Sequence, residues 1–319
     1  MSKAPTMRYR PLGNCGTKVS VLSLGGWTTF GGSVTADSSV REILVAAFEA
    51  GINFFDIADV YARGESERAM GKVLREFPRN RIIISSKVFH PMSDDVNDKG
   101  LSRKHIMESV EASLKRIGTD YLDLYFCHRF DAETPLEETV RAMDDLVHQG
   151  KVLYWGTSEW TGAQLREANR LCDAKGYYAP QVEQPQYSLV ARDRFETDTA
   201  VATQAHGMGV VVWSPLGSGI LTGKYDAGFP QDSRLARVGW LREAVATEKN
   251  LERVRKFATL ATKFGLSRSQ LAIAWAAAHP AVSSVILGAT SLRQLAENLS
   301  ALDVDMNEER RAEISKLFE

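Results

Sequence analysis

Short runs of apolar, β-branched and aromatic residues alternate with amphipathic helical patterns along nearly the whole chain. Eight runs have the length and composition of strands, and several are almost continuously apolar, as is typical of strands buried on both faces. They span 19–26, 52–58, 81–88, 121–128, 152–158, 181–188, 209–215 and 282–289. Eight strands, each followed by a helix, predict an α/β fold of the (β/α)8 TIM-barrel type. A six-stranded doubly wound sheet is the alternative, and eight strand runs fit it less well.

Two of the helical segments carry start and stop signals. One begins at Ser102, an expected N-cap, and ends at Gly118. The other offers Thr134 as N-cap, Pro135 at the first helical position and Gly150 at its end. These signals predict helices that begin and end close to these residues.

Two segments depart from the alternation of strand and helix. Residues 7–19 predict an N-terminal β-hairpin before the barrel, where it would close the bottom. Residues 219–248 separate the seventh strand from its helix, and a loop this long in a compact domain is usually a lid or a ligand clamp. Because no linker or low-complexity stretch interrupts the pattern, we expect residues 1–319 to form a single barrel domain.

Composition excludes several classes of protein. The 319 residues are 44% hydrophobic and 25% charged, and 39 basic against 40 acidic side chains leave no field to attract nucleic acid or an anionic membrane. The three cysteines are widely spaced and no metal-binding motif occurs, so neither a disulfide framework nor a metal is predicted. The start of the chain lacks an apolar leader, and no apolar run approaches the ~18 residues of a membrane span. We therefore expect a cytoplasmic protein with no membrane or nucleic-acid partner.

Polar side chains follow three consecutive predicted strands. Asp56 and Tyr61 come after one strand, Lys87 lies at the end of the next, and His128 follows the one after that. In a parallel barrel the carboxyl ends of the strands converge on the face that carries the chemistry. A Lys ammonium lowers the pKa of a nearby Tyr from about 10, a buried Asp keeps that Lys charged, and a His can orient a carbonyl oxygen. The set predicts a carbonyl reductase that takes its hydride from a cofactor, because no side chain supplies one.

Each of these residues also has a structural explanation when it is taken singly. Asp56 could cap a turn, and Tyr61 could be an aromatic residue at the rim of the barrel. Lys87 could be solvated, and His128 could be a hydrogen-bonded histidine at a strand end. Because all four side chains are expected on the same rim of the barrel, the catalytic interpretation is favoured.

A glycine-rich stretch after the seventh strand fails two motif tests. Gly217, Gly219 and Gly223 are spaced one residue too widely for the dinucleotide fingerprint. The Gly223–Lys224 pair follows Gly219 by one residue too few for a P-loop. Tyr225 stands where Ser or Thr should bind magnesium. Backbone amides at these glycines, with Lys224 as a point charge, could still approach a phosphate.

Seven segments around these residues resemble the aldo-keto reductase family, especially the branch that contains the β-subunits of voltage-gated potassium channels. They are GGWTTFGG, GINFFDIADVYARGESE, GLSRKHI, TPLEETVRAMDDLVHQGK, YWGTSEW, WSPLGSGILTGKY and SSVILGATSLRQLAEN. The resemblance implies a (β/α)8 barrel that binds an extended nicotinamide dinucleotide without a Rossmann domain, which accounts for the failed fingerprint. It also implies a catalytic tetrad with Tyr61 as the proton donor. The tetrad consists of Asp56, Tyr61, Lys87 and His128.

The resemblance further implies that NADPH/NADP+ is the cofactor and identifies the residues that bind it. Gly26, Trp27 and Asp56 would lie near the nicotinamide, and Ser158 and Gln184 would hold its carboxamide. The loop around the pyrophosphate would comprise Trp213, Ser214, Leu216, Gly217 and Ser218, with Lys224 and Arg234. The segment around the adenosine would comprise Gly288, Thr290, Gln294, Glu297 and Asn298.

The chain departs from the family pattern at two places. Position 159 is Glu, where the wider family has Asn and the channel subunits have Arg, and Glu cannot donate to the carboxamide oxygen. Gly288 and Gln294 stand where many NADPH-using members place Lys and Arg around the 2′-phosphate. As in the channel-subunit branch, Thr290, Gln294 and a loop cation would contact that phosphate, so NADPH is favoured over NADH.

The resemblance implies NADPH-dependent reduction of a small aldehyde or ketone to an alcohol. The channel subunits have Asn at the position of His128 and act partly as binding modules, so the complete tetrad favours a working reductase. The alternative is a cofactor-binding regulatory or redox-sensing subunit, and the resemblance then implies a homo-oligomer, in that branch a tetramer. A barrel hydrolase or isomerase would need paired carboxylates or a metal site, which the sequence does not offer.

Overall fold

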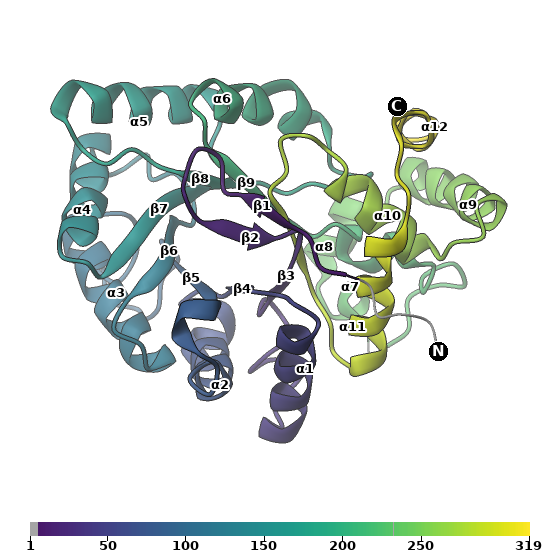
Figure 1. The fold of residues 1–319 in the computed structure, drawn as a ribbon, viewed down its shortest axis with the longest axis horizontal. Helices are drawn as coiled ribbons and strands as arrows, with labels where there is room; N and C mark the ends of the chain where they lie inside the picture. The colour runs from purple at the N-terminus through teal and green to yellow at the C-terminus, as the bar shows by residue number, and fades with distance from the viewer. Residues whose placement is uncertain (1–5, 232) are drawn as a thin grey trace.

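A closed barrel of eight parallel strands forms the centre of the molecule (Figure 1). The computed structural model describes residues 6–231 and 233–319. Around the barrel the strands run β10-β3-β4-β5-β6-β7-β8-β9. Their bounds are β3 Leu22–Gly25, β4 Phe54–Asp56, β5 Ile83–Val88, β6 Leu122–Cys127, β7 Val152–Ser158, β8 Val182–Gln184, β9 Gly209–Trp213 and β10 Ser284–Leu287. Since β10 pairs with β3 and closes the sheet, the predicted barrel is confirmed and the doubly wound sheet is wrong.

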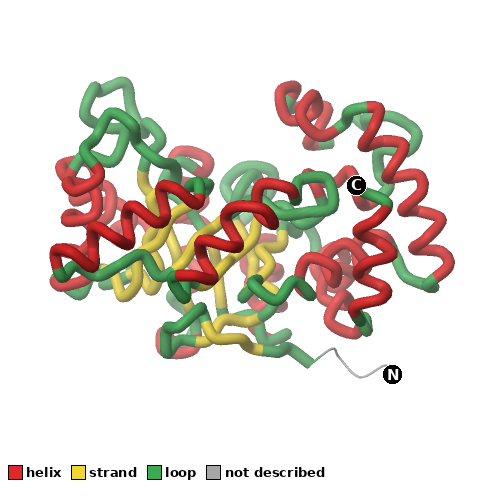
Figure 2. Tube along the Cα trace, turned by 90° about the horizontal axis from the view of Figure 1, so that it is seen from above, coloured by secondary structure: helices red, strands yellow, loops and turns green. Residues whose placement is uncertain are grey.

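Helices surround the strands (Figures 1 and 2). They are α1 Asp37–Glu49, α2 Glu65–Leu74, α3 Arg103–Ile117, α4 Leu136–His148, α5 Gly162–Lys175, α6 Ala200–Ala205, α7 Arg234–Arg237, α8 Gly239–Val245, α9 Glu248–Lys263, α10 Arg268–Ala277, α11 Leu292–Leu299 and α12 Glu308–Lys316. Short 3₁₀ turns occupy Tyr61–Gly64, Arg79–Arg81, Gly217–Thr222 and Ser300–Asp303, and a π-turn spans Phe195–Thr199. None of the helices within the described residues has the length and apolar character needed to cross a membrane.

The start and stop signals in the sequence predict both ends of α3 correctly, but they predict the wrong N-cap for α4. The Ser102 hydroxyl accepts a hydrogen bond from the His105 amide at 3.2 Å, and the helix ends at Gly118 in the left-handed conformation. At α4 the N-cap is Pro135, whose ψ of 129° is not helical. The predicted cap at Thr134 is therefore wrong, because its hydroxyl donates to Asp131 Oδ2 at 2.7 Å instead.

The first predicted strand, 19–26, is in fact two strands. Residues Lys18–Ser20 form β2, which pairs antiparallel with β1, Tyr9–Pro11. The chain bends at Val21, and only then does β3 enter the barrel. The sequence did not reveal this bend, because Val19, Val21, Leu22 and Leu24 are all buried and lie close together in the chain.

The predicted hairpin β1–β2 lies across one end of the barrel (Figures 1 and 2). Leu12 and Val19 are fully buried and pack into the apolar cluster inside the barrel. The hairpin also contacts the β9 side closely, because a Cβ at Gly13, where φ is +57°, would come within 2.3 Å of the Gly207 carbonyl oxygen. The hairpin therefore closes this end, as the sequence predicted.

The barrel interior changes character along its length. Because side chains alternate along a strand, every second residue faces inward. On β5, Ile83 joins the apolar cluster and Lys87 lies on the same face nearer the carboxyl end, while on β4 Phe54 precedes Asp56 in the same way. The apolar cluster consists of Leu12, Val19, Phe54, Ile83, Leu124, Phe126, Val182, Val211 and Ile286. Inward-facing polar residues therefore gather at the end opposite the hairpin.

Candidate active site

The ammonium of Lys87 is the centre of a buried polar cluster at the carboxyl ends of β4, β5 and β6. Its Nζ donates to Asp56 Oδ2 at 2.7 Å, to the Ile57 carbonyl at 2.7 Å and to the Tyr61 hydroxyl at 3.1 Å. The side chain of Lys87 is fully buried. The structure thus brings together three of the four predicted tetrad residues by direct hydrogen bonds.

His128 completes the cluster through ring contacts. Its imidazole packs edge-on against Tyr61, with ring centroids 5.8 Å apart, and His90 packs on it with centroids 4.8 Å apart. Its Nδ1 is buried and has no hydrogen-bond partner among the described residues. Burial, together with Lys87 and Arg129, holds the pKa of His128 well below its ordinary value. The imidazole is therefore neutral near pH 7 and offers one N–H donor.

The protonation of Lys87 and Tyr61 follows from competing effects. Burial acts to lower the pKa of Lys87, but the attraction of Asp56 and the bond to Tyr61 outweigh it, so the pKa is raised and the ammonium is stable. Burial raises the pKa of Tyr61, and Lys87 opposes this rise without cancelling it. The sequence-based expectation of a lowered Tyr61 pKa is therefore wrong in its net direction, because it omitted the cost of removing the phenolate from water.

Two further side chains bind the second oxygen of Asp56. The Ser85 hydroxyl donates to Asp56 Oδ1 at 2.7 Å, and Gln184 Nε2 donates to the same atom at 2.9 Å. The sequence analysis did not single out Ser85, although its position two residues before Lys87 places both on one face of β5. Gln184 was assigned to the cofactor, and here its amide also fixes the carboxylate of Asp56.

The segment that presents Tyr61 is held from behind by a buried acid that was also missed. Asp59 Oδ1 accepts from the Val60 amide at 2.6 Å, and the Ser109 hydroxyl donates to Asp59 Oδ2 at 3.0 Å. Burial, followed by repulsion from the nearby Glu67, raises the pKa of Asp59 to about 7. Only one residue, Val60, separates Asp59 from Tyr61, so this carboxyl group supports the position of the phenol.

Two tryptophans and an arginine from three separate segments meet at the barrel mouth. Trp27, which follows β3, and Trp213, at the end of β9, pack edge-to-face with centroids 5.7 Å apart. The guanidinium of Arg234 lies over the Trp27 ring at 5.4 Å. The long segment after β9 thus folds back onto the mouth, as expected for a clamp. Asp232 of that segment is outside the described residues.

The predicted pyrophosphate loop is a tight turn with an unusual backbone. Ser214, Gly217, Ser218 and Gly219 all have positive φ, in the left-handed region. The buried hydroxyl of Ser218 has no partner among the described residues, and its amide donates to Ser214 Oγ at 3.1 Å. The Leu216 carbonyl accepts from the Gly219 amide at 2.9 Å and so stabilises the turn. The Ser218 hydroxyl and the Lys224 ammonium, which lies close to Gly219, fit a phosphate group.

The predicted adenosine segment forms a second set of polar groups after β10. Gln294 Oε1 accepts from the Thr290 amide at 2.9 Å and from its hydroxyl at 3.0 Å. Asn298 Nδ2 donates to the Gly288 carbonyl at 3.2 Å, and a Cβ at Gly288 would meet nothing within 4 Å. Glu297 accepts from Ser267 at 3.4 Å. Thr290, Gln294 and Glu297 are exposed and Asn298 is buried behind them, and these polar groups beside open space fit a nucleotide.

The remaining predicted cofactor residues have structural partners of their own. The Gly26 amide donates to the Asp56 carbonyl at 2.8 Å, and a Cβ there would come within 2.4 Å of Ser66 Oγ. Ser158 donates to the Gln184 carbonyl at 2.9 Å. Both positions border the tetrad, so a role toward a cofactor is compatible with these bonds.

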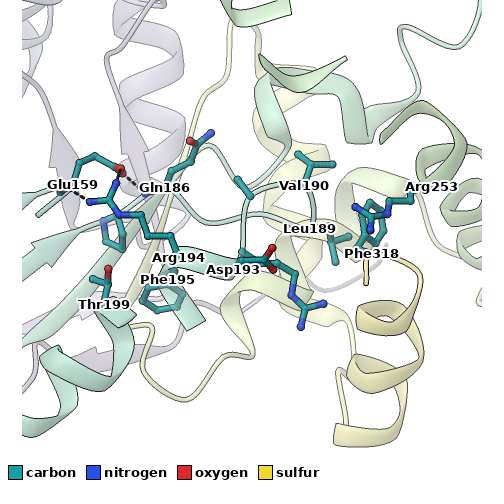
Figure 3. A pocket seen from close by; sticks show the side chains of 13 residues that line it. Glu159, Gln186, Leu189, Val190, Asp193, Arg194, Phe195, Thr199, Arg253 and Phe318 are labelled. Atoms are coloured by element: carbon teal, nitrogen blue, oxygen red, sulfur yellow. Dashed lines mark hydrogen bonds and ion pairs between the residues drawn. The ribbon is translucent and has the colours of Figure 1, made fainter. Parts of the chain in front are cut away.

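A cavity of about 290 Å³ lies beside the ends of β7 and β8, and the tetrad does not line it (Figure 3). Its walls include Glu159, Arg194, Val190, Arg253 and Phe318. Because none of the tetrad residues lines it, we do not assign the chemistry to it.

Comparison with known proteins gives results that agree with this geometry. The model of the aldo/keto reductase family matches residues 21–319. A probable voltage-gated potassium channel subunit beta of Arabidopsis thaliana is 46% identical over 303 residues, which cover 93% of this chain and 92% of the relative. A rice protein of the same description is 45% identical, with the same coverage. A putative voltage-gated potassium channel subunit beta of Schizosaccharomyces pombe is 42% identical, covering 92% of this chain and 88% of the relative.

Proposed function

The chain belongs to the aldo/keto reductase family, and from this premise we propose that it reduces a small aldehyde or ketone to an alcohol with NADPH. The observation that carries the proposal is the bonding of Lys87 Nζ to both Asp56 and the Tyr61 hydroxyl in a fully buried site. Oxidoreductase chemistry is the general activity of the family. The substrate class, the cofactor and the residue roles are proposed here.

The residues divide the work of proton transfer. A bound nicotinamide supplies the hydride that the carbonyl carbon accepts. The Tyr61 hydroxyl gives its proton to the carbonyl oxygen, and the Lys87 ammonium at 3.1 Å stabilises the phenolate that remains. Asp56 keeps Lys87 charged, and the neutral imidazole of His128 orients the carbonyl oxygen. The raised pKa of Tyr61 makes this support from Lys87 necessary, since the phenol alone is a weak acid.

The polar groups of the mouth support an extended dinucleotide as cofactor. The Ser218 hydroxyl, with Lys224 and Arg234, would hold the pyrophosphate. Thr290, Gln294 and Asn298 would hold the adenosine end, and Ser158 with Gln184 would hold the carboxamide. Trp27 and Trp213 would form a wall beside the nicotinamide.

The test is oxidation of NADPH by purified protein with a panel of carbonyl compounds that includes methylglyoxal and nitrobenzaldehyde. Tyr61→Phe should reduce turnover about 10²–10⁴-fold, because it removes the proton donor, and should leave NADPH affinity nearly unchanged. A variant that keeps most of its turnover would overturn the role of Tyr61. Titrations with NADPH and NADH show which cofactor is preferred.

The names of the relatives support a second candidate, a cofactor-binding regulatory subunit of a potassium channel. The two candidates differ in turnover. Tight NADPH binding with a single turnover per protein would favour the regulatory subunit, whereas repeated turnover would favour the reductase.

We also propose that residues 1–319 act as one domain and that the protein forms a homo-oligomer, with a tetramer as the expected form. Light scattering coupled to gel filtration measures the mass directly. A monomer at all concentrations would contradict the tetramer without affecting the proposed reaction.

A further inference from the structure

Glu159 occupies an unusual backbone position at the end of β7. Its φ is +60°, in the left-handed region that residues other than glycine rarely adopt. This conformation turns the side chain toward the loop after β8 (Figure 3). The carboxylate lies next to the cavity described above, with 17% of its side chain exposed.

The carboxylate connects three segments that are separate in the sequence. Its Oε1 accepts from the Gln186 amide at 2.5 Å and from Trp213 Nε1 at 3.0 Å. Its Oε2 pairs with the guanidinium of Arg194 at 2.9 Å, and Arg194 also donates to the Glu159 carbonyl oxygen. Both carboxylate oxygens are therefore engaged, and a direct bond to a nicotinamide carboxamide would compete with these contacts.

The bond to Trp213 fixes the plane of an indole ring at the mouth. An indole has a single polar atom, Nε1, so one hydrogen bond restricts its rotation strongly. Its ring packs at 84° against Trp27, which in turn lies beneath Arg234. A change at Glu159 would therefore be transmitted to the aromatic wall through Trp213.

We propose that Glu159 is a positioning residue that sets the orientation of the Trp213 indole and, through it, the affinity of the mouth for the nicotinamide end of the cofactor. The second half of this inference rests on the proposed function. The first half concerns only this chain and holds with or without a cofactor.

The ion pair between Glu159 and Arg194 should affect the mouth less than the hydrogen bond between Glu159 and Trp213 does. Half of the Arg194 side chain is exposed, and exposed pairs contribute little because water screens them. The Trp213 bond is partly buried. Arg194→Ala is therefore the matched control, since it removes a charge partner of Glu159 and leaves the bond to Trp213.

The first experiment needs no cofactor. In ¹⁵N-labelled protein each of the six tryptophans gives one indole N–H resonance, and Trp213→Phe identifies that of Trp213. Glu159→Ala should move this resonance and speed its exchange with solvent, whereas Arg194→Ala should leave it in place. Glu159→Gln should keep most of the protection, because an amide oxygen still accepts from Nε1. An unchanged Trp213 resonance in folded Glu159→Ala protein would overturn the proposal.

The second experiment is a double-mutant cycle read by NADPH titration. Glu159→Ala and Trp213→Phe should each weaken binding about tenfold, a typical loss for one buried hydrogen bond. If Glu159 acts through Trp213, the double variant should bind no more weakly than the single ones. Additive losses would show that Glu159 contacts the cofactor by itself and would overturn the proposal.

The two experiments also separate this inference from the proposed function. Failure of the unchanged protein to bind NADPH would remove the proposed cofactor, while the response of the Trp213 resonance would still decide the role of Glu159.

Discussion

The two ends of the barrel interior are built on the same strands but hold opposite kinds of side chain. At the hairpin end, Leu12, Phe54 and Val211 pack in an apolar cluster. At the other end, Lys87 and Asp56 form a buried ion pair at 2.7 Å. Burial of apolar side chains stabilises a fold directly, whereas a buried ion pair gains little net stability because both charges leave water. The comparison therefore assigns stability to the first end, and it leaves the second end to the chemistry that we propose.

The largest effect is expected when only one partner of the Lys87–Asp56 ion pair is removed. Lys87→Met should lower the free energy of unfolding by about 3–5 kcal/mol, because Asp56 would stay buried without its cation. Turnover should fall to background, since Tyr61 loses the ammonium that stabilises its phenolate. Urea unfolding and NADPH oxidation measure the two effects.

The control for this variant is Lys87→Met combined with Asp56→Leu. Removing both charges should recover part of the lost stability but none of the turnover. The recovery is partial because Ser85 and Gln184 lose their acceptor. No recovery would contradict the view that the unpaired carboxylate causes the loss.

Shortening a side chain at the opposite end should separate stability from activity. Leu12→Ala should cost about 2–5 kcal/mol of unfolding free energy, as truncation of a fully buried leucine does. At a temperature where the variant is folded, kcat/KM should match that of the unchanged protein. A fall in kcat/KM with intact fold would show that the two ends are coupled.

The buried acid behind Tyr61 predicts a pH dependence of stability. Its pKa is raised from 3.8 to about 7, so the folded state holds the proton more tightly than the unfolded state. The stability that Asp59 contributes is therefore full below about pH 4 and declines as the pH rises toward 7, by at most about 1.4 kcal/mol per pH unit. Unfolding of Asp59→Asn measured from pH 5 to 8 should show a shallower decline. Equal slopes would contradict a raised pKa at Asp59.

The smallest expected change concerns the Ser218 hydroxyl, in the turn that we propose binds phosphate. Ser218→Ala should leave the melting temperature nearly unchanged, because the hydroxyl bonds to nothing among the described residues. NADPH affinity should fall about five- to tenfold if the hydroxyl binds the cofactor. Unaltered affinity would remove Ser218 from the proposed binding set.

The sequence predicted the barrel because the strands are buried on both faces and the apolar period marks each one. It also predicted the meeting of Asp56, Tyr61, Lys87 and His128, because parallel strands deliver their ends to one rim. The bend at Val21 was not predicted, because Val19, Val21, Leu22 and Leu24 lie so close together that they resemble one strand. The N-cap at Pro135 was not predicted, because the Thr134 hydroxyl donates its hydrogen bond to Asp131, three residues earlier, and so does not cap the helix.

Other features depend on distances that a linear pattern does not contain. The net pKa shift of Tyr61 results from a balance between burial and Lys87, and burial cannot be weighed from spacing. The partners of Glu159 come from the loop after β8, the end of β9 and the π-turn region. The sequence marked Glu159 as a departure from the family but gave no sign that its carboxylate binds Trp213.

The N-terminal hairpin contacts the C-terminal part of the barrel, although almost the whole chain separates them in sequence. The order of synthesis therefore affects how the barrel closes. Arg10 donates to the Ala277 carbonyl, 267 residues away, and Ser284 donates to the Ser20 carbonyl. A ribosome adds about 5–20 residues per second, so the N-terminal segment waits roughly 10–50 s for these partners. During that interval Leu12, Val19 and Leu24 have no barrel to enter. Substitutions along this seam should therefore reduce the yield of newly made protein, through aggregation or chaperone retention, more than they reduce the activity of molecules that have closed.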